Sequence, residues 1–494
     1  MKGMVKKMKK RITSVILAAV MLAALPGCTA KKQDGGESGG DVLTWYVPGD
    51  KQLDMQSVMD AANAIVEPAI GAKIDLKMID DGSYSEKMQM MMASGEIFDL
   101  MFTGYVNNYS QAVKRGGLMD ITDMIDKYAP KLRDEISPLA FEQAYIDGKI
   151  YAVPNYQTMS LKPAIAVRKD LADEFGLDKS KIKSINDMEP FMEWVKNNHT
   201  ELYAYRPQMG MRPWTDENYY EVFTGFLASQ DELHSGENKV TLQPAYENDV
   251  FVAGAHKLYE WYQKGYIRKD ILTVTDDSGD YKIGKYAVCY GSWKPGAEKS
   301  TKNATGYDYE YIIMNEERRP FAEGAVNAMT GISRTSKNPE KAMKFIELIN
   351  TNKELYNIFC FGIEGKHYTK DDEGHIVVDS NSGYFQNNSD WKFGNQFNAY
   401  ILSGNDDNIW EETKKLNDEA VEYPLSGFTF DNSNVTAELT AIETVNSQYS
   451  VLNKGAQNPD EYFETFKEKQ KEAGVEKVLA EYQRQIDEFL AKKK

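Results

Sequence analysis

Tryptophans in predicted loops and at strand ends are the residues whose type and position point most directly to chemistry. The chain has seven tryptophans, and four of them lie in such places: Trp45, Trp214, Trp293 and Trp391. An aromatic ring packs against the C–H face of a sugar, while polar side chains bond the hydroxyl groups around its rim. These four residues therefore predict a site that binds a polar solute with an apolar face, such as a carbohydrate.

Two other tryptophans and one arginine have a different setting. Trp194 and Trp261 lie in apolar runs with helical spacing, so we expect both in the hydrophobic core. Arg206 precedes Pro207 and can present a planar fork of N–H donors to a ligand hydroxyl or carboxylate. A surface ion pair explains this arginine equally well.

Catalytic and metal-binding patterns are incomplete in this sequence. The glycines and lysine from Gly279 to Lys285 have phosphate-loop spacing, but Tyr286 replaces the Ser or Thr that must hold Mg²⁺. The five histidines show no HExxH motif and no pair at i and i+4. We therefore expect no metal, no cofactor and no catalytic residue. A glycoside hydrolase or lyase with two acidic residues remains the alternative from another class, because 75 acids offer many pairs.

The first forty residues predict export and a lipid anchor. A basic start is followed by an apolar stretch from Val15 to Leu25, which is too short to span a bilayer as a stable helix. The following residues, Leu25-Pro26-Gly27-Cys28, resemble a bacterial lipobox, in which the cysteine is acylated and becomes the new N-terminus. We expect a signal peptide over residues 1–27, lipid on Cys28, and a flexible Gly-rich tether over residues 28–40.

Composition bounds the rest of the chain. The formal net charge of −17 argues against nucleic acid as a partner, because phosphates need clustered Lys and Arg. A length of 494 residues exceeds what one core usually holds, so two lobes are expected. No second apolar run is long enough to cross a membrane.

Cys289 and Cys360 lie in apolar strings, which favours two buried thiols, with one disulfide as the alternative.

Strand and helix patterns alternate after the tether. The run from Val42 to Val47 is β-branched and aromatic and ends at Pro48-Gly49, as a buried strand does. A helical pattern, a second strand over 73–79, a Met-rich helix over 85–94 and a third strand over 98–102 follow. Such alternation is typical of parallel βαβ units, so we expect an α/β fold.

Several motifs in succession resemble extracellular solute-binding proteins of ABC importers, carbohydrate-type family 1. They are the segments 91–100, 147–154 (Asp-Gly-Lys-Ile-Tyr-Ala-Val-Pro), 167–171 (Val-Arg-Lys-Asp-Leu), 284–293 and 338–346. The segments 361–368 and 481–489 resemble a subgroup of Gram-positive lipoproteins with a C-terminal domain of unknown function. The likeness covers about Asp41 to Phe489.

The resemblance implies a two-lobed periplasmic-binding-protein-like (type II) α/β fold with a hinge and discontinuous lobes. We place lobe 1 at residues 41–157 and 295–350, and lobe 2 at 158–294 and 351–494. The chain then crosses between lobes near Pro154, near Trp293 and after the helix that ends near Ile349. Tyr105, Asn155 and Tyr156 fall where this family has cleft loops, and they join the four loop tryptophans and Arg206 as predicted ligand-binding residues.

The resemblance also implies a function. We expect a monomer on the extracellular face of the cytoplasmic membrane of a Gram-positive-type bacterium, held there by its lipid anchor. It would capture a carbohydrate, in particular an oligosaccharide, and deliver it to the permease of an ABC transporter. A peptide or another small polar solute, or a role as a ligand-presenting sensor, remain alternatives on the same fold.

The lipobox interpretation predicts a clear effect of one substitution. Wild-type protein should begin at Cys28 and partition with membranes, whereas Cys28→Ala should release the protein or leave it uncleaved, because the acylated thiol is lost. Membrane fractionation and N-terminal mass spectrometry measure this. A Cys28→Ala product that is processed and membrane-bound like the wild type would contradict the prediction.

Overall fold

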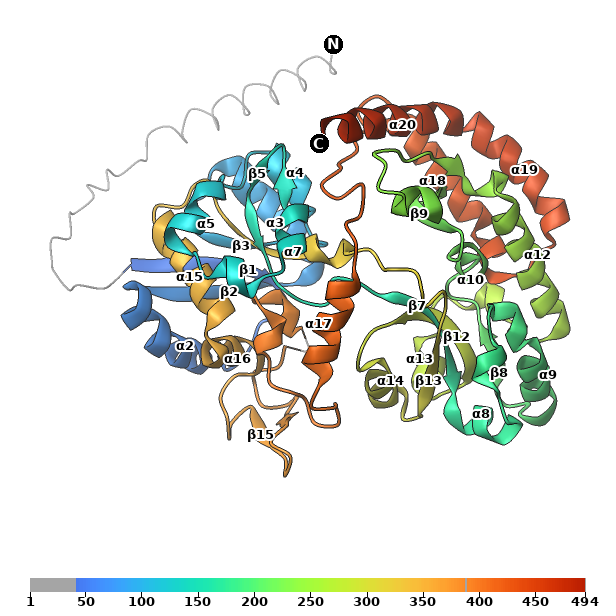
Figure 1. Cartoon of the computed structure of the whole chain (residues 1–494), viewed down its shortest axis with the longest axis horizontal. Coiled ribbons are helices and arrows are strands. Elements are labelled where there is room, and N and C mark those ends of the chain that lie inside the picture. Colours follow the sequence, from blue (N-terminus) through green and yellow to red (C-terminus); the bar gives the residue numbers. More distant parts are fainter. Residues whose placement is uncertain (1–40, 387–388, 494) are drawn as a thin grey trace, which may run out of the picture. The chain divides into compact units, whose positions relative to one another are not determined.

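Two separate β-sheets, each with its own hydrophobic core, organise the chain (Figure 1). The computed structural model describes residues 41–386 and 389–493, so the predicted signal peptide, Cys28 and the tether lie outside the described residues. We call the part built on the first sheet lobe 1 and the part built on the second sheet lobe 2. The predicted two-lobed α/β fold is confirmed.

Lobe 1 has a five-stranded sheet in the order β2-β1-β3-β14-β6. Its strands are β1 (Asp41–Pro48), β2 (Ala72–Ile79), β3 (Leu100–Gly104), β6 (Ala152–Pro154) and β14 (Ala328–Ile332). β1 pairs in parallel with β2 and β3, and the helices α2 (Met55–Ile70) and α3 (Asp81–Ser94) make the crossovers. β14 returns late in the sequence and runs antiparallel to β3 and β6. The predicted βαβ alternation is therefore confirmed.

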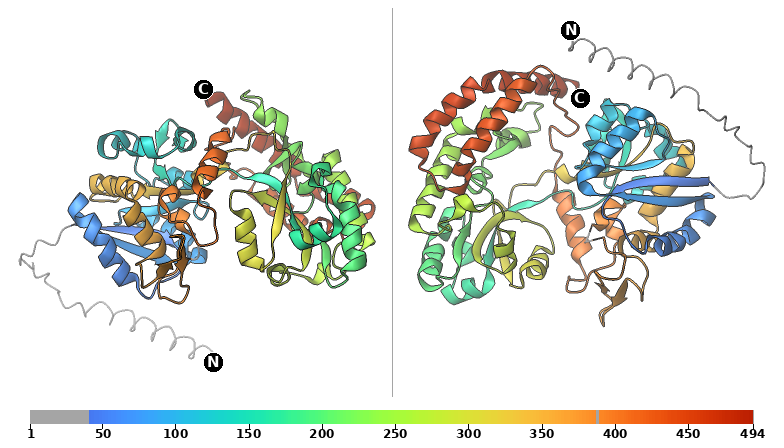
Figure 2. Two further views of the ribbon diagram at one scale, coloured as in Figure 1. Left: turned by 60° about the horizontal axis from the view of Figure 1, so that its bottom comes forward. Right: turned by 180° about the vertical axis from the view of Figure 1, so that it is seen from behind.

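Helices from distant parts of the chain pack against this sheet. α15 (Pro339–Thr351) contacts α2 and α5, and α16 (Lys353–Phe361) contacts α2, as Figure 2 shows from two further sides. The remaining elements of lobe 1 are α4 (Tyr109–Lys114), α5 (Thr122–Tyr128), α6 (Leu132–Glu135), α7 (Pro138–Gln143), α17 (Ile409–Glu419), and the hairpins β4 (Tyr145–Ile146) with β5 (Lys149–Ile150) and β15 (Tyr368–Lys370) with β16 (Ile376–Val378).

Lobe 2 has a four-stranded sheet in the order β13-β7-β12-β8 and a smaller sheet β11-β10-β9. The strands are β7 (Lys162–Arg168), β8 (Tyr203–Arg206), β9 (Tyr219–Phe223), β10 (Phe226–Ser229), β11 (Gln243–Pro244), β12 (Tyr286–Trp293) and β13 (Tyr309–Ile313). Its helices are α8 (Lys169–Phe175), α9 (Glu189–Asn198), α10 (Arg212–Thr215), α11 (Gln230–His234), α12 (Asp249–Lys264), α13 (Ser278–Lys282) and α14 (Ala297–Thr305).

The C-terminal helices complete lobe 2. They are α18 (Thr436–Tyr449), α19 (Pro459–Glu472) and α20 (Val475–Lys492), which follow one another and contact each other. α19 contacts α12, and the red helices lie beside the green ones in Figures 1 and 2. Apolar side chains of this region, among them Phe463, Val478 and Ile486, are buried in the same core as the sheet of lobe 2.

Two lobe boundaries predicted from the sequence are wrong. Residues 295–313 contribute β13, which pairs with β7 and therefore belongs to lobe 2 rather than lobe 1. The described residues of 353–386 and 389–420 supply side chains to the core of lobe 1, where Tyr356 and Phe359 are fully buried, rather than to lobe 2. In both cases the partner that buries the apolar face is far away in the sequence, so local patterns do not identify it.

Three segments pass between the lobes, and the backbone joins them side by side. They cover residues 157–163, 314–324 and 417–423. The N–H of Gly324 donates to the carbonyl of Met159 at 2.7 Å, and that of Ala322 donates to the carbonyl of Val421 at 2.9 Å. A Cβ on Gly324 would lie 2.9 Å from the carbonyl oxygens of Thr158 and Met159, so only glycine fits this close approach.

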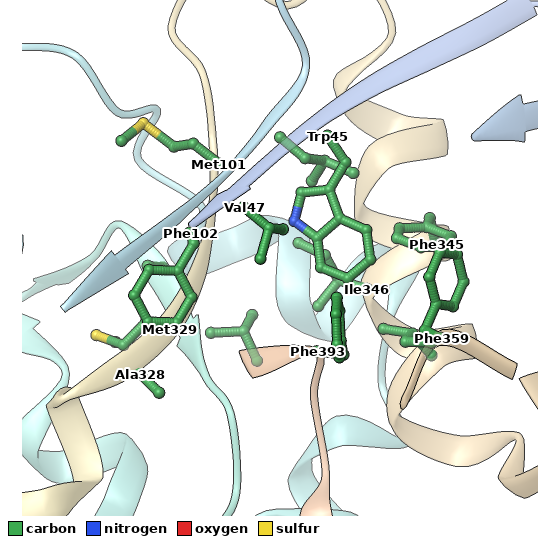
Figure 3. Packing of buried hydrophobic residues seen from close by; sticks show 14 of the residues in the cluster. Trp45, Val47, Met101, Phe102, Ala328, Met329, Phe345, Ile346, Phe359 and Phe393 are labelled. Atoms are coloured by element: carbon green, nitrogen blue, oxygen red, sulfur yellow. The ribbon is translucent and has the colours of Figure 1, made fainter. Parts of the chain in front are cut away.

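Trp45, which the sequence places at the end of the first strand, is a core residue. Trp45 is 0% exposed, and its ring meets Phe345, Phe359 and Phe393 edge-on with centroids 5.3 to 5.8 Å apart (Figure 3). The prediction that Trp45 binds ligand is therefore wrong. It lies inside β1 on the face that packs against α15 and α16, so no solute can reach it. Trp261 is also fully buried, as predicted.

Both cysteines that follow the tether are buried and free. Burial raises the pKa of the Cys289 thiol to about 12, so it stays protonated. Two buried thiols were the favoured interpretation of the sequence, and this interpretation is confirmed. Among the described residues, no helix is both long enough and apolar enough to cross a membrane.

The position of Trp45 predicts a stability effect. Trp45→Ala should lower the free energy of unfolding by about 3–5 kcal/mol, because it leaves a cavity between three aromatic rings. Leu53→Ala is the control, since Leu53 is 90% exposed and its removal should change stability by no more than about 0.5 kcal/mol. Urea unfolding measures both variants, and equal effects would contradict the core assignment.

Candidate functional site

A cavity adjoins the crossing segments. Its volume is about 510 Å³, which is within the range of about 300–1,000 Å³ typical of small-molecule sites. Two of the three crossing segments and several elements of lobe 2 form its walls. The side chains that the following paragraphs use are Arg212, Asp216, Tyr220, Glu221, His234, Ser292, Lys294, Arg318, Arg319, Phe321 and Glu323. We call this space the hinge cavity.

An arginine and an aspartate one turn apart form one wall of the hinge cavity. Arg212 and Asp216 lie at the start and the end of α10, and the guanidinium contacts the carboxylate at 3.1 Å. The hydroxyl of Tyr290 also donates to Asp216, at 3.3 Å. Burial raises the pKa of Asp216, and the positive charge of Arg212 opposes this effect. The two charges neutralise each other, and the pair still offers hydrogen-bond donors and acceptors to the cavity.

A second acidic group comes from the crossing segment. Glu323 begins the short helix η5 (Glu323–Val326), and its carboxylate accepts a hydrogen bond from the hydroxyl of Tyr220 on β9. Burial raises the pKa of Glu323, while the Tyr220 hydrogen bond and the charge of Arg212 lower it. Burial and the nearby carboxylate also raise the pKa of the Tyr220 phenol. This bond ties lobe 2 to the hinge.

Two consecutive arginines fix the second crossing segment onto its neighbours. Arg318 contacts Asp231 of lobe 2 at 3.1 Å. Arg319 donates to the carbonyls of Glu419 and Ala420 at 2.7 and 3.1 Å. The ring of His234 stacks on Phe321, with centroids 4.2 Å apart, and thereby covers this segment. The cavity wall at the hinge is thus held by charge-assisted bonds.

Tyr105 and Trp391 come together on lobe 1, although they are far apart in the sequence. Their rings meet edge-on with centroids 5.5 Å apart, and both pack against Phe102. Tyr105 follows β3 directly and is 56% exposed. Asn155, which is 2% exposed, holds the loop by donating to the backbone carbonyls of Trp391 and Lys392. Asn155 therefore positions the pair and cannot itself contact a solute, which corrects its predicted role.

An electrostatic interaction links the neighbour of Trp391 with a residue of the hinge cavity. Burial raises the pKa of Asp390, the neighbour of Trp391, while a hydrogen bond from Gln396 and the charge of Lys294 lower it. Lys294 lines the hinge cavity from lobe 2. Trp293, the preceding residue, is partly exposed, and its indole N–H donates to Glu298 at 3.1 Å. Trp293, Tyr105 and Trp391 remain candidate ligand residues.

Three predicted site residues are engaged in other contacts. Tyr156 is 7% exposed and packs on Phe397 at 4.6 Å. Trp214 packs on Trp261 at 5.2 Å. None of the eight predicted ligand residues lines the hinge cavity. Neighbours of three of them do line it: Gln157 follows Tyr156, Arg212 and Asp216 flank Trp214, and Ser292 and Lys294 flank Trp293.

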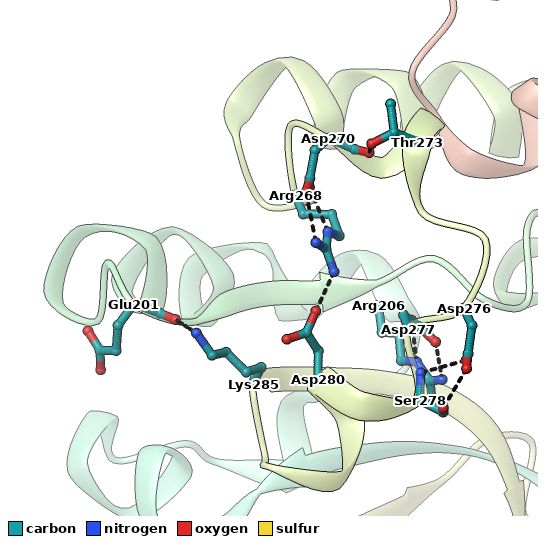
Figure 4. A network of polar contacts seen from close by, with 10 residues as sticks. All are labelled: Glu201, Arg206, Arg268, Asp270, Thr273, Asp276, Asp277, Ser278, Asp280 and Lys285. Carbon is teal, nitrogen blue, oxygen red and sulfur yellow. Dashed lines mark hydrogen bonds and ion pairs between the residues drawn. The ribbon is translucent and has the colours of Figure 1, made fainter.

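Arg206 belongs to a network of ion pairs at the edge of lobe 2. Its guanidinium pairs with Asp277, and it lies 4.5 Å above the ring of Tyr281. Figure 4 shows this pair beside a second one, in which Arg268 contacts Asp280. The structure favours the ion-pair alternative for Arg206 over a ligand-binding role, because Nε and Nη2 bond Asp277 and the residue does not line the hinge cavity.

Sequence reasoning missed the polar residues of the hinge cavity. Arg212 and Asp216 stand four residues apart around Trp214 in the sequence, but the tryptophan was predicted as the ligand residue instead. Arg318 and Arg319 precede Pro320, and this charged run with its proline was the available sign of a crossing segment. Glu323 has no local pattern that marks it.

One cluster in the described residues has the composition of a metal site. Ligand atoms of Asp371, Glu373 and His375 lie within 4.8 Å of one another. All three belong to the turn between β15 and β16, and the Asp371 carboxylate accepts the backbone N–H groups of the other two at 3.1 and 2.9 Å. These bonds explain the acidic turn as a hairpin cap.

The buried carboxylate of the hinge cavity predicts a pH-dependent stability. The fold raises the pKa of Glu323 above its ordinary value near 4.5 and so favours the protonated form. This contribution is fully present below about pH 4.5 and is lost as the pH rises through the folded-state pKa. Glu323→Gln should therefore gain stability relative to the wild type between acidic and neutral pH. Urea unfolding at several pH values measures the difference.

Glu221→Gln is the matched control, because Glu221 lines the same cavity but is exposed. Its stability relative to the wild type should vary less with pH. A Glu323→Gln difference that stays constant with pH would show that the carboxylate is not destabilised by burial.

Comparison with known families and proteins agrees with this architecture. Residues 54–355 match the family described as bacterial extracellular solute-binding protein, and residues 424–491 match a domain of unknown function (DUF3502). A "carbohydrate ABC transporter substrate-binding protein" of Streptococcus pneumoniae serotype 4 is 31% identical over 99% of both chains. "Lipoprotein LipO" of Bacillus subtilis is 21% identical over 76% of this chain and 77% of its own.

Solved structures give the same picture. The N-glycan transport solute binding protein (NgtS) from Streptococcus pneumoniae superposes with a TM-score of 0.79 at 29% identity, covering 92% of this chain and all of its own. Its complex with Man5GlcNAc superposes with a TM-score of 0.63, covering 92% of this chain and 99% of its own. The lobes, the hinge and these similarities together show that the chain belongs to the bacterial extracellular solute-binding protein family.

Proposed function

We propose that this protein captures an extracellular oligosaccharide at the hinge cavity and delivers it to the permease of an ABC importer. The observation that carries the proposal is the position of the cavity, which adjoins the segments that pass between the lobes. A relative that covers almost the whole chain is named a carbohydrate ABC transporter substrate-binding protein. NgtS has been crystallised with Man1GlcNAc and Man5GlcNAc.

The polar groups of the cavity suit a neutral, hydroxyl-rich ligand. Asp216 and Glu323 accept hydrogen bonds from sugar hydroxyls, and Arg212 and Lys294 donate to ring and hydroxyl oxygens. Arg212 neutralises Asp216, and Glu323 accepts a hydrogen bond from the uncharged Tyr220 hydroxyl. A ligand with a net charge would upset this balance inside a partly desolvated site, whereas a neutral glycan leaves it intact.

The aromatic pair on lobe 1 supplies the apolar part of recognition. Tyr105 and Trp391 offer ring surface on lobe 1, and Trp293 stands on lobe 2 between Ser292 and Lys294, which line the cavity. A sugar that occupies the hinge cavity stacks on these rings with its C–H face, and movement about the crossing segments brings both sets of contacts onto it. Binding remains reversible because no covalent step is involved.

We expect the protein to bind and release its ligand without changing it chemically. The relatives are substrate-binding proteins rather than enzymes, and we extend this to the present chain. Acylated Cys28 would hold the protein on the extracellular side of the membrane, where it can load a permease. A glycan recovered unchanged after long incubation with the protein supports this assignment, and a shortened glycan would contradict it.

A glycan panel tests the proposal directly. Isothermal titration with Man1GlcNAc, Man5GlcNAc, a linear glucan and a peptide of similar length should give heat only with glycans. Trp391→Ala should weaken glycan binding by about 2–4 kcal/mol, as buried aromatic anchors do, without lowering the melting temperature of the free protein. Binding of the peptide alone would overturn the carbohydrate assignment.

Trp194→Ala is the matched control for Trp391→Ala. Trp194 is partly buried against Phe175 and Phe191 on α8 and α9 of lobe 2. This variant should lower the melting temperature and leave glycan affinity unchanged. Equal affinity in the wild type and Trp391→Ala would remove the aromatic pair from the site.

A further inference from the structure

We propose that a second chamber, roofed by the C-terminal DUF3502 region, binds an outer arm of the same oligosaccharide. This inference rests on the proposed function and deepens it, since it makes the ligand an extended or branched glycan rather than a mono- or disaccharide. It also gives the C-terminal helices a role in ligand recognition.

The chamber has a volume of about 340 Å³ and lies where the C-terminal region meets lobe 2. Lobe 2 contributes residues 208–212 before and within α10, the β9–β10 turn around Thr224, and the start of α12 at Phe251. The C-terminal region contributes α18, the short helix η8 (Ser450–Lys454) and α19. Neither part encloses the space alone, so the DUF3502 region creates it.

The chamber and the hinge cavity share two wall residues. Arg212 and Glu221 line both spaces, so the cavities adjoin each other on opposite sides of the same pair of side chains. Glu221 is exposed, and the Arg212 side chain is 42% exposed, so neither is locked into a sealed core. A chain of sugar units that starts at the hinge would pass these two residues and continue beneath the C-terminal helices.

One buried acceptor in the chamber has no partner within the described residues. Gln470 of α19 is only 2% exposed, and its Nε2 donates to Asn446 Oδ1 at 2.5 Å. Its Oε1 receives no hydrogen bond from any described group. A buried amide oxygen without a donor costs free energy, and a ligand hydroxyl would satisfy it once the Gln470 side chain turns toward the chamber.

The remaining lining matches a neutral sugar. Tyr246, Tyr449 and Phe466 form an aromatic group, with centroids 5.6 Å apart between Tyr246 and Phe466 and 5.0 Å between Tyr449 and Phe466. Amide and hydroxyl groups stand among these rings, and Arg212 and Glu221 are the charged residues of the lining. Aromatic surface interspersed with amides is the composition that carbohydrate sites use, whereas a charged arm would find no counter-ion deep inside.

The test compares a short and a long glycan on the same variants. We use Man1GlcNAc and Man5GlcNAc as probes, with dissociation constants from isothermal titration. The wild type should bind Man5GlcNAc about tenfold more tightly or better, because the longer glycan reaches the chamber. Thr224→Trp, which fills the mouth of the chamber from an exposed position, should remove this preference and leave Man1GlcNAc binding intact.

Gln470→Leu, close in size, should reduce the preference several-fold by deleting the unpartnered acceptor. Thr440→Trp is the matched control, because Thr440 is exposed on α18 and does not line the chamber. It should keep the preference. Melting temperatures of the free variants show that each one folds.

The outcomes separate this inference from the proposed function. Wild-type protein that binds neither glycan would refute the proposed function. Equal affinity of the wild type for both glycans, or a preference that survives Thr224→Trp, would refute the chamber while leaving glycan binding at the hinge established. A loss of affinity for both glycans to the same extent in Thr224→Trp would also overturn the inference.

Discussion

The hydrogen bonds among the three crossing segments are the constraint on which the rest of the structure depends. Each lobe is completed by segments that are far apart in the sequence, because the chain leaves the lobe and later returns. The three crossing segments must therefore lie together. Met159 shows how tightly they are joined, since its carbonyl accepts from Gly324 and its N–H donates to Asn417 of the third segment at 2.8 Å. Few residues per segment separate the cores, so rotation about the hinge changes the lobes' separation without unfolding either core.

The same constraint determines where charged groups can stand. The carboxylates of Asp216 and Glu323 beside the crossing segments are largely covered, and this burial raises their pKa values. Arg212 and Tyr220 offset the cost, so both acids stand in a polar, hydrogen-bonded wall. Such a wall suits a ligand that brings many hydroxyl groups and no charge of its own, and it explains why the strongly acidic composition of the chain does not govern the chemistry of the site.

The C-terminal helices extend this site rather than form a separate body. Their apolar face is buried in the core of lobe 2, where Val478 and Ile486 are 0% exposed, so they move with that lobe. A wall built partly from α18 and α19 then keeps a constant distance from α10. The hinge cavity can change as the lobes move, while a chamber inside one lobe stays preorganised for the outer part of a ligand.

Local sequence by itself determined the alternating βαβ start of lobe 1, the burial of Trp261 and the family likeness, because these depend on residues close together in the chain. The export signal remains a prediction from the sequence. Tertiary structure decided the lobe boundaries and the site. Trp45 and Trp391 were both predicted to bind ligand, yet Phe345 and Phe359 enclose the first and Tyr105 meets the second. Burial depends on which distant segment supplies the partner, and a pattern of neighbours along the chain does not contain that information.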